Sequence, residues 1–227
     1  MIVRVNQVGA HPPGVDYLLG ADCGKECDPA ALCVVARTLL EQPEDEEHPH
    51  YYELLFAKEL QLGTPYTDFV DYLELLATDP SLKGLTSLAV DHTGVGQVVL
   101  DMLRDRESLA EVTWAVYYTA GKNEKQEGMN FNVPKKNLVH NLLVMMQRGQ
   151  MGVAENCPDA HLLKRQLLKF VMKRTAAARD RYEAEATRDH DDLVNALACA
   201  VWLGERIDML DGTESDGFAP YRAAGWR

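Results

Sequence analysis

Apolar residues in the first quarter of the chain recur in short blocks that predict three successive strands. Residues 17–22 form a continuous apolar run that ends in an acid, and residues 30–39 form a second such run. Residues 51–62 alternate well enough between apolar and polar side chains for a third strand. The acidic stretch 41–50 lies between the second and third blocks as a turn, so the pattern predicts an antiparallel three-strand meander.

From residue 64 onward the period of the pattern changes, and helices begin to alternate with strands. Residues 67–77 carry apolar side chains at helical spacing, with Pro65 as a start signal. Residues 85–90 are an apolar run that ends at Asp91, as a central parallel strand would. The pattern then predicts a helix over 98–109, a strand over 112–118, a helix over 134–147 with Pro134 at its first position, and a short strand over 151–154.

The last third of the chain is predicted to close the fold with helices. Residues 161–169 begin as a helix, and residues 170–173 and 182–184 are predicted to pair as a hairpin around a basic turn. Residues 189–210 place apolar side chains on one face of a closing helix. The order of elements predicts an α/β fold whose mixed sheet joins an antiparallel three-strand meander to parallel strands, with flanking helices.

Composition and the positions of glycine and proline predict one globular domain with two tails. Residues 1–14 and 207–227 are expected to be tails, with the domain over residues 15–206. An apolar content of 46% is enough to bury a core. No apolar run approaches the length of a membrane span and no secretory signal is visible, so a cytoplasmic protein is expected.

Charge is unevenly distributed along the chain, although the net charge is −12. An acidic total by itself argues against binding to nucleic acid. Residues 164–188, however, hold eight basic and three acidic side chains and could form a local basic face for a polyanion, or only a solvated surface. The candidate contacts with a nucleic-acid backbone are Lys169, Lys173, Arg174, Arg179, Arg181 and Arg188.

The five cysteines predict reduced thiols, because their number is odd and their spacing shows no disulfide framework. Cys23 and Cys27 have a spacing that would suit half of a zinc site, but the chain has no second pair. Buried or loop thiols are the better interpretation.

Three aspartates stand where carboxylates carry chemistry. Asp22 and Asp91 each end a predicted buried strand, and Asp191 lies in the first turn of the closing helix. Any one of them could be structural, since an acid at a helix start complements the helix dipole. If the two strands are neighbours, the three carboxylates meet at one edge of the sheet, repel one another and attract a divalent cation. Mg²⁺ and Mn²⁺ prefer such oxygen ligands.

Three motifs resemble those of the nuclease domains of phage terminase large subunits, which have an RNase H-like fold. Residues 20–24 read GADCG and residues 28–31 read DPAA, similar to the first strand and turn of those domains. Residues 90–96 read VDHTGVG, similar to the second acidic motif. Residues 190–198 read HDDLVNALA and resemble the third, which is the most specific of the set. The resemblance spans residues 17 to 205.

The resemblance implies a two-metal endonuclease that cuts concatemeric viral double-stranded DNA during genome packaging. By motif matching, Asp22, Asp91 and Asp191 are the catalytic metal ligands for two Mg²⁺ or Mn²⁺ ions, with Asp192 as a further candidate ligand. The resemblance also implies that the chain acts in the host cytoplasm, with an ATPase motor domain, a portal and a small terminase subunit as partners. The chain itself has no phosphate-binding loop of the Gly-x4-Gly-Lys-Ser/Thr type, so no motor activity is assigned to it. The candidate neighbours of the ligands are His92, His190 and Asp28.

Rival functions remain open on the sequence alone. A resolvase or an integrase of the RNase H-like class would use the same acids. An actin-like or sugar-kinase-like ATPase could use residues 22–24 and 91–96 as phosphate-binding turns. That fold normally has two comparable lobes in a longer chain and gives no evident role to the acids at residues 191 and 192. A non-catalytic packaging domain is disfavoured by the presence of all three acids.

Overall fold

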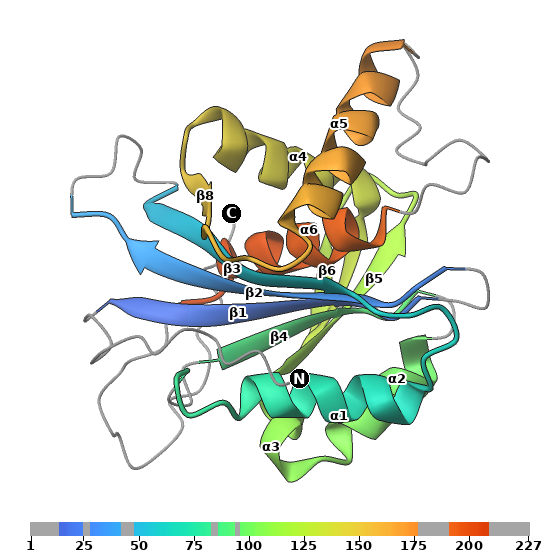
Figure 1. Ribbon diagram of the computed structural model, residues 1–227. Coiled ribbons are helices and arrows are strands. Elements are labelled where there is room, and N and C mark those ends of the chain that lie inside the picture. Colours follow the sequence, from blue (N-terminus) through green and yellow to red (C-terminus); the bar gives the residue numbers. More distant parts are fainter. Residues whose placement is uncertain are drawn as a thin grey trace.

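A single mixed sheet organises the described part of the chain (Figure 1). The computed structural model describes residues 14–24, 28–41, 48–82, 86–93, 96–176 and 191–208. Within those residues the sheet has eight strands in the order β6-β7-β5-β4-β1-β2-β3-β8. The order places β1 and β4 side by side at the centre, where the chain crosses from the antiparallel half to the parallel half.

The antiparallel half is the predicted meander. Its strands are β1 (Val15–Asp22), β2 (Ala31–Leu39) and β3 (His50–Glu59). The register of β1 with β2 runs without interruption from Val15 opposite Thr38 to Asp22 opposite Ala31. Every residue of β1 is buried, which explains why this segment has a continuous apolar run instead of alternation.

The parallel half begins with β4 (Thr86–Asp91), which pairs with β1, and continues through β5 (Thr113–Thr119) and β7 (Asn130–Pro134). The strand β6 (Lys125–Glu127) closes this edge in antiparallel pairing, and β8 (Met151–Val153) adds a parallel strand at the opposite edge beside β3. The predicted mixed sheet is therefore confirmed. The strands β6 and β7 are not in the sequence-based prediction.

Two helical layers cover the two faces of the sheet, as Figure 1 shows. One layer contains α1 (Tyr66–Ala77), α2 (Gly96–Arg104) and α3 (Glu107–Ala110). The other contains α4 (Lys135–Gln147), α5 (Ala160–Ala176) and α6 (Asp192–Gly204). Each layer closes its own hydrophobic core against the sheet. None of the helices in the described residues is long and apolar enough to cross a membrane.

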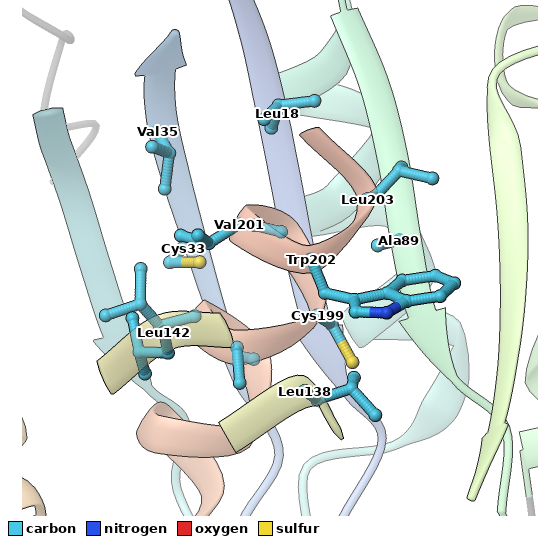
Figure 2. Packing of buried hydrophobic residues seen from close by; sticks show 14 of the residues in the cluster. Leu18, Cys33, Val35, Ala89, Leu138, Leu142, Cys199, Val201, Trp202 and Leu203 are labelled. Atoms are coloured by element: carbon cyan, nitrogen blue, oxygen red, sulfur yellow. The ribbon is translucent and has the colours of Figure 1, made fainter. Parts of the chain in front are cut away.

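Helix α6 packs unusually close to the sheet, and every one of its residues is buried. Gly20 of β1 permits this approach, because a Cβ atom at that position would lie 2.0 Å from the carbonyl oxygen of Ala196. Figure 2 shows α6 side chains, Trp202 among them, between the sheet and α4. A helix held this way has little freedom to shift, so the residues at its two ends are fixed relative to the strands.

Three predicted elements differ from the observed ones. The hairpin prediction is wrong for residues 170–173, which belong to α5. The spacing of the apolar residues Leu163 and Phe170 keeps one face of this helix on the core. Residues 182–184, the other half of the predicted hairpin, lie outside the described part. The predicted helix over 98–109 is two helices, α2 and α3. Pro134 ends β7 and precedes the first residue of α4.

Candidate metal centre

Asp22 and Asp91 lie side by side at the carboxyl ends of the two central strands. The parallel register of β1 and β4 pairs Asp22 directly with Asp91. Paired residues of neighbouring strands lie on one row of the sheet, and the strands are about 4.8 Å apart. Both residues are buried, with 9% and 8% of their surface exposed. The strand ends thus place two carboxylates together in a protected position.

The start of α6 brings two more carboxylates to the same place. Asp191 precedes the helix and Asp192 is its first residue, with Asp192 buried. The Asn195 side chain connects the two sources of acid, because its Nδ2 donates to Asp22 Oδ2 at 3.0 Å and to Asp191 Oδ1 at 3.3 Å. Asn195 is a site residue that motif reasoning missed. Its position four residues after Asp191, on the same helix face, is the signal that could have found it.

Burial and mutual repulsion raise the pKa values of the acids in this cluster. Burial raises the pKa of Asp22, and burial together with the nearby charge of Asp22 raises that of Asp91 to about 7. Burial, followed by the charges of Asp22, Asp191, Asp28 and Glu59, raises the pKa of Asp192 to about 8. The cluster therefore holds less negative charge than its carboxyl count would give, until a cation is present.

Backbone donors orient the two strand-end carboxylates. The Gly24 amide donates to Asp22 Oδ1 at 3.3 Å, and the Thr93 amide donates to Asp91 Oδ1 at 2.8 Å. Gly24 adopts φ +63°, and a Cβ atom there would lie 2.6 Å from the Asp28 carbonyl oxygen. The backbone needs glycine at this position, which is the physical content of the first sequence motif.

Lys135 supplies positive charge to the cluster and was also missed from the sequence. Its Nζ lies 3.5 Å from Asp191 Oδ2 and 5.6 Å from the centre of the Tyr118 ring. It lowers the pKa of both Asp22 and Asp91, against the larger effect of burial. A lysine in the first turn of α4 opposes the helix dipole at a cost of about 0.3–1 kcal/mol, which makes the position notable in the sequence.

The donor set of the cluster suits a hard divalent cation. Asp22, Asp91, Asp191 and Asp192 would offer carboxylate oxygens, which Mg²⁺ and Mn²⁺ prefer. Asp191 Oδ2 is buried and has no hydrogen-bond partner among the described residues. Across the same part of the chain, no three His, Cys, Asp or Glu side chains converge closely enough to enclose an ion. The residues fit such an ion chemically, and binding it would require the carboxylates to turn toward one another.

The other predicted neighbours of the ligands have different positions. His92 is half-buried next to Asp91, and its ring lies 5.4 Å from that of the exposed Tyr117. Burial, and then the charge of Arg104, lower the pKa of His92. Asp28 is exposed and acts on Asp192 through its charge. His190 lies outside the described residues.

The basic segment is described only in part. Lys169 lies on α5, the helix that packs beside the start of α6. Lys173 and Arg174 belong to the same helix, but their side chains lie outside the described part, as do residues Arg179, Arg181 and Arg188. The predicted nucleic-acid face therefore stays a prediction.

The thiols of this region do not form a zinc site in the described residues. Cys23, Cys33, Cys157 and Cys199 are free and buried, and Cys27 lies outside the described part. Burial, followed by the charges of Asp22 and Asp91, raises the pKa of Cys23 well above its usual value. A protonated thiol is a poor metal ligand, so Cys23 contributes packing at the end of β1.

Comparison with known proteins gives one structural likeness to report. No protein family model matches the chain, and no curated protein matches it. The nuclease domain of the large terminase from bacteriophage SPP1, solved with bound Mn, is similar in structure with a TM-score of 0.45 and 10% sequence identity. The superposition covers 83% of this chain and 86% of that one.

Proposed function

We propose that this chain is an RNase H-like, metal-dependent DNA endonuclease. The observation that carries the proposal is the position of four carboxylates, those of Asp22, Asp91, Asp191 and Asp192, where β1 and β4 end and α6 begins. Asp22 and Asp91 are paired in register at the ends of β1 and β4, and Asn195 connects Asp22 to Asp191 at the start of α6. Asp22, Asp91 and Asp192 are buried and their pKa values are raised, which marks a candidate functional site on physical grounds.

Asp22, Asp91 and Asp191 would hold Mg²⁺ or Mn²⁺, with Asp192 as a further ligand. When bound, such ions activate water for attack on a phosphodiester and stabilise the leaving oxygen. The chain contributes the placement of the carboxylates. Asn195 and the amides of Gly24 and Thr93 hold them at one edge of the sheet, and Lys135 balances part of their charge before a cation binds.

DNA binding would come from the basic segment 164–188, whose first part lies on α5. Lys169, Lys173, Arg174, Arg179, Arg181 and Arg188 would contact phosphates without reading bases, which predicts little sequence preference. The substrate that the motifs favour is concatemeric viral double-stranded DNA, cut during packaging. The proposed partners are an ATPase motor domain, a portal and a small terminase subunit.

The test is a cleavage assay on supercoiled plasmid with Mn²⁺, Mg²⁺ or EDTA. We expect nicked or linear product with a divalent ion and none with EDTA. Asp91→Asn, which removes a ligand charge without changing size, serves as the inactive control. Asp101→Asn on α2 is the matched control, because Asp101 is exposed and its carboxylate bonds only to the Gln97 side chain among the hydrogen bonds described. Equal cutting in EDTA, or by Asp91→Asn, would contradict the proposal.

A further inference from the structure

A buried glutamine joins three elements immediately beside the acid cluster. Gln166 lies on α5 and only 7% of its surface is exposed. Its Oε1 accepts a hydrogen bond from the Leu193 amide of α6 at 3.1 Å. Its Nε2 donates to Glu59 Oε2 at the end of β3, at 2.9 Å. The side chain thus bridges β3, α5 and the first turn of α6.

The contact with Leu193 takes the place of a helix cap. The first amides of a helix have no partner within the helix and are usually satisfied by the side chain that precedes it. Asp191 stands at that position in α6, yet its side chain makes no capping hydrogen bond. Instead Gln166 satisfies the Leu193 amide from a neighbouring helix. Asp191 is therefore released from the capping role and keeps its carboxylate for the cluster.

The contact with Glu59 fixes the orientation of the Gln166 amide. If the amide were turned over, its oxygen would face the Glu59 carboxylate and its nitrogen would face the Leu193 amide, and both hydrogen bonds would be lost. Glu59 is itself anchored, because its backbone amide donates to Asp159 Oδ2 at 3.1 Å just before α5 begins. The start of α6 is thereby tied to the end of β3 through one side chain in one orientation.

We propose that Gln166 is the positioning residue that holds the first turn of α6, and with it Asp191 and Asp192, in place for cation binding. The inference rests on the proposed function of the acid cluster. The two hydrogen bonds described for Gln166 go to Glu59 and to the Leu193 amide, so its effect on the acids passes through the backbone of α6. Partners that orient metal ligands typically contribute about 10–100-fold to metal affinity or activity.

The experiment measures Mn²⁺ affinity by calorimetry, together with kcat and KM for plasmid cleavage. Gln166→Met keeps the size of the side chain and removes both hydrogen bonds. We expect a loss of about 10–100-fold in Mn²⁺ affinity and a lower kcat with KM little changed. Gln150→Met is the matched control, since Gln150 also donates from Nε2, to the carbonyls of His48 and His50, but lies far from the acids in the sheet.

A charge-neutral exchange tests whether the hydrogen bonds themselves matter. Gln166→Glu alone sets two carboxylates against each other and should weaken Mn²⁺ binding. The double variant with Glu59→Gln keeps the net charge and restores both bonds, with residue 59 now donating and residue 166 accepting from both sides. We expect it to recover Mn²⁺ affinity.

The outcomes separate this inference from the proposed function. If Gln166→Met melts at a lower temperature but keeps wild-type Mn²⁺ affinity and kcat, Gln166 is only structural and the inference is overturned. The inference is likewise overturned if Gln150→Met loses as much affinity as Gln166→Met. A wild-type protein that binds no Mn²⁺ would overturn the proposed function itself, and this inference with it.

Discussion

Buried carboxyl groups at the two ends of α6 have pKa values that are shifted in opposite directions. At its start, Asp22, Asp91 and Asp192 are buried near one another and their pKa values are raised. At its end, Glu205 also has a buried side chain, but its pKa is lowered. Burial alone would raise the pKa of Glu205; the neighbouring His50, Tyr52 and His48 outweigh that effect.

The contrast is sharpest in a fully buried ion pair near the end of α6. Arg37 and Asp16 make two hydrogen bonds, from Nε to Oδ1 at 2.9 Å and from Nη2 to Oδ2 at 2.5 Å. Nη1 of Arg37 also donates to the carbonyls of Gly204 and, at 2.8 Å, Ile207. The guanidinium thus satisfies the carbonyl groups that a helix leaves unpaired at its end.

The difference distinguishes a structural polar site from a binding site. A buried charge that serves only stability is paired and hydrogen-bonded, because an unpaired one destabilises the fold. The acids at the start of α6 have one cation, Lys135, near them among the contacts described, and Lys135 lies 3.5 Å from Asp191 alone. An excess of carboxylates over cations lowers the stability of the fold. The lost stability is regained when a divalent ion binds.

The largest expected effect is the loss of cleavage on removing an acid from the cluster beside the start of α6. Asp22→Asn and Asp91→Asn should each abolish plasmid cutting. Because the repulsion within the cluster falls, the melting temperature in EDTA should stay equal or rise. Cleavage assays and thermal melts of the same preparations check both halves. A variant that cuts normally, or that melts far lower, would break the comparison.

The same assay sharpens the choice between the two acids of α6. We expect Asp191→Asn to abolish cutting and Asp192→Asn to do less harm, since Asn195 connects the Asp191 carboxylate to that of Asp22. If only Asp192→Asn abolishes cutting, Asp192 is the ligand, in keeping with its greater burial. If both variants cut, the third ligand lies elsewhere.

The second largest effect is on stability, at the other end of α6. Arg37→Met leaves the buried Asp16 carboxylate and two carbonyl groups without their partner. We expect a loss of about 3–5 kcal/mol in the free energy of unfolding, typical of breaking a buried ion pair. Chemical denaturation measures it. A variant that also removes the acid, Arg37→Met with Asp16→Leu, should recover part of the loss, and Mn²⁺ affinity should be unaffected in either.

A smaller effect is expected where Glu205 meets His48 and Tyr52. Glu205→Gln keeps the size of the side chain and an acceptor oxygen for the Tyr52 hydroxyl, but removes the charge that faces His48. Exchanging a charge-assisted hydrogen bond for a neutral one costs about 1 kcal/mol. Chemical denaturation should show that loss with normal cleavage. Loss of cleavage without loss of stability would mean that the two ends of α6 are not separate in function.

The sequence predicts the central elements because their residues are buried on both faces or carry a clear period. The runs that end at Asp22 and Asp91 predict β1 and β4, and the shared end of these strands predicts that the two acids meet. The strands β6 and β7 could not be predicted, because residues 120–132 are mostly polar and the pairing depends on contacts with β5 rather than on local pattern.

The residues that support the acids were less predictable for a related reason. Lys135 and Gln166 come from α4 and α5, and each reaches the start of α6 from a distant part of the chain. No local motif predicts such a contact, since the contact depends on how the helices pack. Asn195 differs, because it lies one helical turn from Asp191 and its role follows from spacing alone.

The dependence of metal-free stability on pH compares both ends of α6 in one measurement. The acids of the cluster have raised pKa values, about 7 for Asp91 and about 8 for Asp192. The folded state therefore holds protons that the unfolded state releases near pH 4. Their contribution to stability is fully present below pH 4 and is lost as the pH rises through 7 and 8. Glu205 has the opposite sign, because its lowered pKa gives stability that is lost only as the pH falls below its usual range.

We therefore expect the melting temperature in EDTA to fall between about pH 5 and pH 8.5, as Asp91 and Asp192 lose their protons in the folded state. Asp91→Asn and Asp192→Asn should flatten that fall, because an amide cannot release a proton. Glu205→Gln should leave it unchanged, since Glu205 is already ionised throughout this range. Saturating Mn²⁺ should remove or reverse the fall, because a bound cation favours the ionised carboxylates. The opposite result would be a metal-free protein whose stability rises steadily from pH 5 to pH 8.5. It would mean that neighbouring groups stabilise the ionised carboxylates at the start of α6 as well as they stabilise Glu205, and the two ends of α6 would no longer differ.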